Sequence, residues 1–84
     1  MNQEQTDKLA SSLALALIYL SAWNEKETLG EVHRAWKGYD FTILDQLKEA
    51  GFIDFSYNAK SLFLTEEGIA KAKVLIEKLS AIPL

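Results

Sequence analysis

The sequence predicts a single α+β domain of the winged-helix type, in the order helix-helix-helix-hairpin-helix. The stretch from Arg34 to Ile53 contains two glycines, Gly38 and Gly51, that each suit the position just after a helix. Asp40, between them, suits the N-cap of a helix. A run of alternating apolar and polar residues follows Gly51, and a second capping signal begins at Thr65. These signals predict a hairpin and then a closing helix.

The first helix is expected from Asp7 to about Trp23, after a frayed segment at residues 1–6 in which Asn2 and Thr6 compete as N-caps. Its main apolar stripe recurs at helical spacing and should face the core: Leu9, Leu13, Ala16, Leu17, Leu20 and Trp23. The opposite face is apolar as well, with Ala14, Leu15, Ile18 and Ala22. A helix that is apolar nearly all round is either buried on two sides or shared with another subunit.

A second helix is expected from residue 29 to residue 36 or 37, after a charged linker at residues 24–27. Thr28 and Glu31 form the Thr-x-x-Glu pattern of a capping box, which predicts a helix start. Gly38 would then be the residue after the end of this helix.

A third helix is expected at residues 41–50, with Asp40 as its N-cap and Gly51 after its end. Tyr39 and Leu44 can close as a hydrophobic staple at its start. At its far end Phe52 can fold back onto Leu47. The outward positions of this helix are Thr42, Asp45, Gln46 and Glu49.

The hairpin is expected from two strands, residues 53–57 and 61–64, joined by a turn at Asn58 and Ala59. Asparagine suits such a turn because it tolerates left-handed φ. Thr65 should cap the last helix, whose first turn carries Glu66 and Glu67. The expected inner face of that helix is Ile69, Ala72, Ile76 and Leu79, and Pro83 marks its end.

Two resemblances accompany these elements. The run SLFLTEEG at residues 61–68, which follows AGFI at residues 50–53, resembles the wing and following helix of bacterial winged-helix regulators. RAWKGYDF at residues 34–41, with the apolar first helix and LTEEG, resembles a family of short bacterial proteins known only as a domain of unknown function. This second resemblance covers most of the chain from Leu9 to Leu79. It implies the fold and implies no activity.

Composition excludes several classes of protein. The chain has 84 residues, enough for one domain (1–84) with a modest core but not for a deep active-site cleft as well. It has no cysteine, so disulfides and thiolate metal sites are excluded. Its N-terminus lacks the basic region of a secretory signal, and the apolar run at residues 13–20 is far shorter than a membrane span. We therefore expect a cytoplasmic protein.

No motif in the sequence indicates an enzyme, a cofactor or a metal. His33 is the only histidine, and its nearest carboxylate, Glu31, would lie on another face of a helix. We expect His33 to be a surface histidine. Phosphate-binding glycine loops, nucleophile elbows and zinc-protease motifs are all missing from the sequence.

Aromatic and basic residues gather around the expected turn at Gly38. The candidate partner-binding patch consists of Arg34, Trp36, Lys37 and Tyr39. Such a patch would suit a protein partner. The alternative, which we favour, is that these aromatic rings lock two helices where they cross.

We expect a non-enzymatic module for protein interaction or self-association, with a homodimer formed through Leu15, Ile18 and Ala22. The alternative is a winged-helix transcriptional regulator that binds DNA as a dimer. Its DNA contacts would be Arg34, Lys37, Gln46, Lys48 and Lys60. DNA binding is disfavoured because Asp45 and Glu49 would face the phosphate-lined groove and the chain has a net charge of −3. A membrane partner is not expected either.

Overall fold

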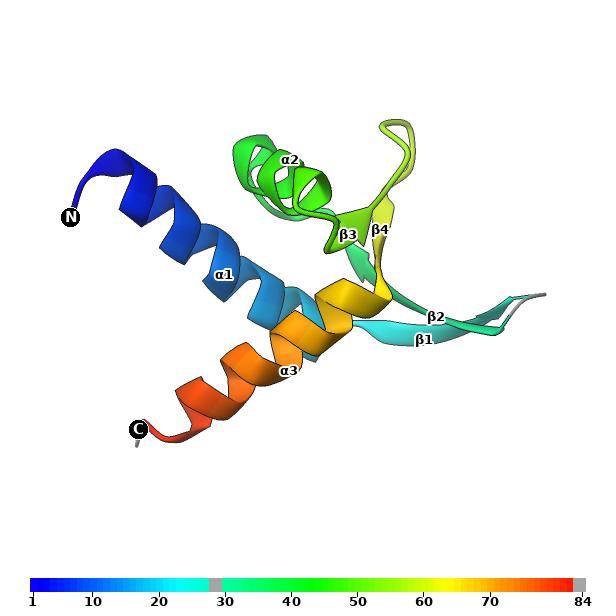
Figure 1. Cartoon of the computed structure of the whole chain (residues 1–84). Coiled ribbons are helices and arrows are strands. Elements are labelled where there is room, and N and C mark those ends of the chain that lie inside the picture. The colour runs from blue at the N-terminus through cyan, green and yellow to red at the C-terminus, as the bar shows by residue number, and fades with distance from the viewer. Residues whose placement is uncertain (28–29, 83–84) are drawn as a thin grey trace.

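The computed structural model describes residues 1–27 and 30–82. These residues form three helices and a four-stranded antiparallel sheet in the order α-β-β-α-β-β-α (Figure 1). The elements are α1 (Gln3–Ser21), β1 (Trp23–Glu27), β2 (Gly30–Trp36), α2 (Phe41–Glu49), β3 (Ile53–Asp54), β4 (Ser61–Leu64) and α3 (Glu66–Ser80). The strand order in the sheet is β1-β2-β4-β3. The predicted order helix-helix-helix-hairpin-helix was therefore wrong, and with it the winged-helix assignment.

The second predicted helix is a strand. Residues 30–36 form β2, which pairs antiparallel with β1 and, on its other side, with β4. Trp23 lies opposite Arg34, and Arg34 lies opposite Phe63. The backbone of Gly30 has a φ of 128°, which a helix does not accommodate. The capping-box pattern was misleading here, and its Thr28 lies outside the described residues.

Gly38 does not follow a helix, and its φ is not positive. The turn predicted at Asn58 is present, since the Ala59 N–H donates to the Ser56 carbonyl at 3.0 Å. It does not use left-handed φ, because no non-glycine residue in the described part of the chain has a positive φ. The strand predicted at residues 53–57 is confined to β3, and the chain from Phe55 to Lys60 is a loop.

The other boundaries follow from local signals. Asp40 caps α2 by accepting a hydrogen bond from the Thr42 N–H at 2.8 Å. Gly51, with a φ of 83°, ends α2 in a Schellman motif: its N–H donates to Lys48, and the Phe52 N–H donates to Leu47. These predictions are confirmed.

The caps of the two longer helices are equally well defined. Thr65 caps α3 through the Gly68 N–H, as predicted. Asn2 and Gln5 form a capping box that starts α1 at Gln3, so the expected fraying of residues 1–6 is not observed.

The core lies between the sheet and the inner sides of α1 and α2. Its largest fully buried side chains are Leu15, Ile18, Leu44, Ile53 and Leu62. Gly68 lies directly against the backbone of Phe52, and a Cβ at this position would overlap the Phe52 carbonyl. This close approach joins the start of α3 to the end of α2.

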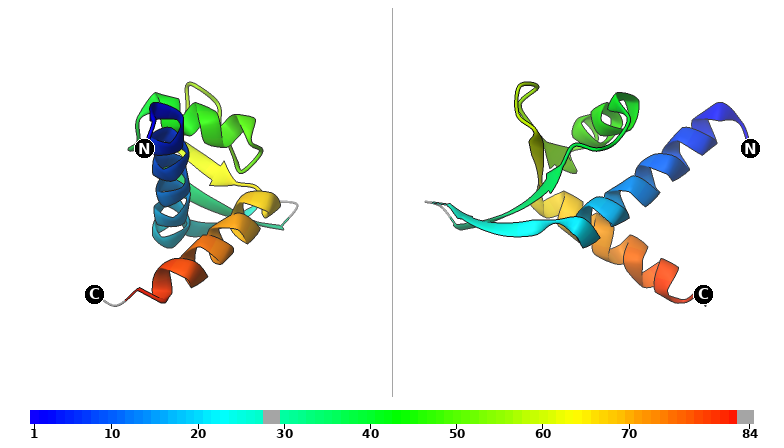
Figure 2. Two further views of the ribbon diagram at one scale, coloured as in Figure 1. Left: turned by 60° about the vertical axis from the view of Figure 1, so that its left-hand side comes forward. Right: turned by 180° about the vertical axis from the view of Figure 1, so that it is seen from behind.

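The helices α1 and α3 are in contact where α1 ends and α3 begins, and they diverge toward the two chain termini (Figures 1 and 2). The β1–β2 hairpin extends from the opposite side of the molecule. The outer halves of α1 and α3 therefore form a V.

Candidate functional site

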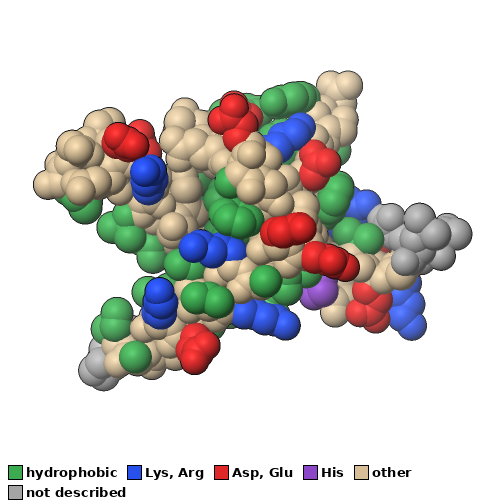
Figure 3. Space-filling model, in the orientation of Figure 1, with side chains coloured by type: hydrophobic (Ala, Val, Ile, Leu, Met, Phe, Trp, Pro, Cys, Tyr) green, Lys and Arg blue, Asp and Glu red, His purple; other side chains and the backbone are tan. Residues whose placement is uncertain are grey.

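Four leucines of the α1 stripe that was expected to be buried are exposed, although Ala16 in the same stripe is buried. Leu9, Leu13, Leu17 and Leu20 are 49%, 47%, 54% and 65% exposed, and we call these four residues the leucine face. Because an α-helix turns by about 100° per residue, the four side chains fall within an arc of about 80°. Residues 9–24 include no charged residue at all. Figure 3 shows apolar side chains on the edge of α1 that borders the V.

The opposite face of α1 is the buried one, so the predicted dimer face was wrong. Leu15 is 1% exposed and Ile18 is fully buried within the chain, while Ala22 is partly buried against the same core. The buried face also has the small residues Ser11 and Ala14, which let α2 approach closely. The Ser11 hydroxyl donates to the Gln46 side-chain oxygen at 2.5 Å, which fixes this face against α2.

The leucine face continues into a small apolar groove between α1 and the C-terminal half of α3. The groove has a volume of about 170 Å³, and its lining residues are Leu9, Ser12, Leu13, Leu75, Lys78, Leu79 and Ile82. Leu79 was predicted to lie on the inner face of α3, yet it is 41% exposed, and Ile82 is 65% exposed. Because α1 and α3 diverge here, the inner face of α3 loses its partner within the chain.

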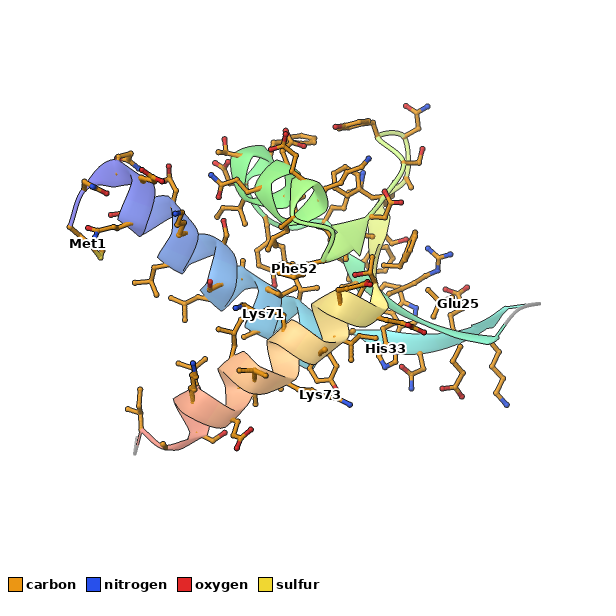
Figure 4. All side chains as sticks on the ribbon, in the orientation of Figure 1. Met1, Glu25, His33, Phe52, Lys71 and Lys73 are labelled. Atoms are coloured by element: carbon orange, nitrogen blue, oxygen red, sulfur yellow. The ribbon has the colours of Figure 1, made fainter. Side chains whose placement is uncertain are left out.

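A larger hollow lies deeper, between α1, α2 and α3. It has a volume of about 680 Å³, and its apolar lining is Leu15, Leu47, Phe52 and Leu75. Figure 4 shows Lys71 in front of the space between α1 and α3, whereas Lys73 lies on another side of α3. Ser12 and Leu75 line both the hollow and the small groove, so the two form one continuous depression along the inner side of the V.

The predicted partner-binding patch is only partly assembled. Arg34 and Trp36 lie on the face of the sheet that points away from the core, where Trp36 is 64% exposed and its ring lies 4.9 Å from that of Trp23. Arg34 forms an ion pair with Glu25 at 2.8 Å. Tyr39 instead packs against the core. The prediction that these rings lock two helices was wrong, because the residues belong to a sheet and a loop.

Three of the basic residues considered for DNA contacts, Lys37, Lys48 and Lys60, lie around the loop that joins β3 to β4, and the Lys37 N–H donates to the Lys60 carbonyl at 3.2 Å. Lys37 donates to the Ser56 carbonyl at 2.8 Å and Lys48 to the Phe55 carbonyl at 2.9 Å, and both ammonium groups lie over the Phe55 ring. Lys60 is exposed in the loop before β4. Both lysine contacts hold the loop that joins β3 to β4.

The whole chain can now be compared with known proteins. The model of a domain of unknown function, DUF6429, matches residues 5–81. The chain belongs to this family. It is similar to the uncharacterized protein y4hR of Sinorhizobium fredii (strain NBRC 101917 / NGR234), with 38% identity over 74 residues that cover 87% of this chain and 89% of that protein. No solved structure matches the chain.

Membership of the DUF6429 family confirms the predicted resemblance to a bacterial domain of unknown function.

His33 is half-buried, and its ring stacks on that of Tyr19 at a centroid distance of 6.1 Å. Within residues 1–27 and 30–82, no group of three or more histidine, aspartate or glutamate residues could hold a metal ion. Nor is any helix in the described chain long and apolar enough to cross a membrane.

The sequence showed that α1 has two apolar faces, but it did not show which face is exposed. Both faces of α1 are apolar, and the leucines were assigned to the core because they recur at helical spacing. The small residues Ser11 and Ala14 were the better indicator, because small side chains mark the side on which another helix approaches.

Proposed function

We propose that this protein is a non-enzymatic self-association module that forms a homodimer through the leucine face. The observation that carries the proposal is the uncharged strip of Leu9, Leu13, Leu17 and Leu20, each about half exposed or more. Contiguous apolar surface of this kind marks interaction sites in proteins. A second copy of the chain is a suitable partner, because a C2 interface requires a patch that complements itself and an uncharged leucine strip does so.

The size of the leucine face sets the expected affinity. Fully burying a leucine contributes roughly 1.5–3 kcal/mol, so burying the exposed remainder contributes about 1 kcal/mol each. Across two copies this gives about 8 kcal/mol, against an association cost of roughly 4–15 kcal/mol. The leucine face alone is therefore marginal, and the exposed apolar residues of α3 must enlarge the interface.

The self-association proposal is tested by sedimentation equilibrium over a range of protein concentrations. We expect the mass of a dimer at high micromolar concentration for the wild-type chain. Leu13→Gln combined with Leu17→Gln should give a monomer, because glutamine keeps the helix propensity but removes the apolar surface. Phe41→Gln is the matched control, since Phe41 is 62% exposed on α2 and lies outside the leucine face. A monomeric wild-type chain, or one that binds lipid vesicles instead, would contradict the proposal.

The exposed Trp36 favours a second interaction surface for a different protein, on the outer face of the sheet. Tryptophan and arginine are enriched among residues that dominate binding energy, and Trp36 lies beside Arg34. This surface lies on β1 and β2, whereas the leucine face lies on α1. We expect Trp36→Ala to leave the homodimer mass unchanged, because the two surfaces are separate.

A further inference from the structure

The spacing of the leucine face is nearly symmetric about its centre. Counting from Leu9, its members are separated by four, four and three residues, so the strip reads almost the same from either end. In an antiparallel pair of helices, such a strip places Leu9 opposite the partner's Leu20 and Leu13 opposite the partner's Leu17. Every leucine of one copy then meets a leucine of the other.

From this spacing and the open V we infer that α1 of a second copy lies antiparallel to α1 of the first and that its C-terminal half closes the groove between α1 and α3. This inference rests on the proposed self-association and adds the orientation and the residues that meet. Leu9 and Leu13 line the groove together with Leu79 and Ile82. In the antiparallel arrangement, the residues brought to that groove are the partner's Leu17 and the partner's Leu20.

The same arrangement uses the exposed end of α3. Leu79 and Ile82 are 41% and 65% exposed, and Leu20 is the most exposed member of the leucine face at 65%. Bringing the partner's Leu20 to Leu79 and Ile82 covers all three at once. In a parallel pair the partner's Leu9 and the partner's Leu13 would reach the groove instead, and Leu20 would meet the partner's Leu20 far from Leu79 and Ile82.

Charge complementarity points in the same direction. The last turn of α1, residues 18–21, has no lysine or arginine to complement the negative end of its helix dipole. Lys78 lines the groove that receives this end of the partner helix. A lysine near the carbonyl end of a helix stabilises it, so Lys78 would supply across the interface the cation that α1 lacks.

Disulfide mapping tests the orientation of the two helices. Because the chain has no cysteine, every crosslink must form between the introduced cysteines. We expect the double variant Leu9→Cys/Leu20→Cys to form a covalent dimer on oxidation. The two cysteines of one chain lie about 16 Å apart along the helix, too far for a disulfide within the chain. Leu9→Cys alone should remain largely uncrosslinked. Efficient crosslinking of Leu9→Cys with itself would overturn the antiparallel arrangement while leaving self-association intact.

The role of Lys78 is tested by the dissociation constant of the dimer. Lys78→Glu should raise that constant several-fold, and the effect should shrink at high salt. Lys73→Glu on the same helix is the control and should have little effect, because Lys73 is exposed away from the groove. Equal effects of the two variants would contradict the placement of Lys78, and a wild-type chain that stays monomeric would overturn both the orientation and the proposed function.

Discussion

Gly51 shows how one residue can decide a boundary. Its φ of 83° lets the chain leave α2 in a Schellman motif, in which Gly51 and Phe52 satisfy the last carbonyls of the helix. The space around it is open, since a Cβ built at Gly51 meets nothing within 4 Å. The need for glycine is therefore purely conformational, and it positions Phe52 next to Gly68 of α3.

Replacing Gly51 by a residue with a Cβ should destabilise the fold. We expect Gly51→Val to lower the free energy of unfolding by about 1–2 kcal/mol, because a residue with a Cβ is strained at this φ. Gly38→Val is the control: its surroundings are also open, its φ is not positive, and its effect should stay within about 0.5 kcal/mol. Urea denaturation measures both, and equal values for the two variants would mean that α2 does not depend on a left-handed residue.

The elements differ in how far the sequence alone could predict them. Elements with local signals, such as α2 between Asp40 and Gly51 and the start of α3 at Thr65, were predicted because capping depends on neighbouring residues. β1 and β2 were missed because the charged strand β1 depends on pairing with β2, and β2 depends on pairing with the distant strand β4, with Arg34 opposite Phe63. An exposed apolar face of α1 was predicted, but on the wrong side of the helix.

The two sides of α1 should respond differently to truncation. Leu15→Ala should destabilise the fold by about 2–5 kcal/mol, because Leu15 is only 1% exposed and its removal leaves a cavity. Leu17→Ala should cost less than about 1 kcal/mol in a monomer, because Leu17 is 54% exposed. Thermal and urea unfolding at low protein concentration, where association is negligible, distinguishes the two. A larger loss for Leu17→Ala would reverse the assignment of the faces.

At the scale of the whole molecule, the charges disfavour nucleic acid as a partner. Non-specific DNA binding comes mainly from cations that displace counterions, and this chain has a net charge of −3. Lys37 and Lys48 contact backbone carbonyls and the Phe55 ring, while Asp45 and Glu49 are exposed on α2. Lys48 also lies beside an acidic residue, since it forms an ion pair with Asp54 at 3.6 Å.

We expect no useful affinity for duplex DNA at physiological salt. The measurement is a titration of fluorescent duplexes, both random and drawn from the upstream region of the gene, at low and physiological salt. We expect any DNA binding to be weak at low salt and to disappear when salt is added. Sub-micromolar binding at physiological salt, weakened by Lys37→Glu and strengthened by Glu49→Lys, would contradict it.

The central claim is that the leucine face is covered by a second copy of the chain. Methyl NMR of leucine-labelled protein over a range of concentrations tests it most directly, because it reports each leucine separately. The account predicts concentration-dependent shifts for the methyl groups of Leu9, Leu13, Leu17 and Leu20, with little change for the buried Leu44 and Leu62. Spectra that do not depend on concentration, or shifts confined to residues outside the leucine face, would contradict it.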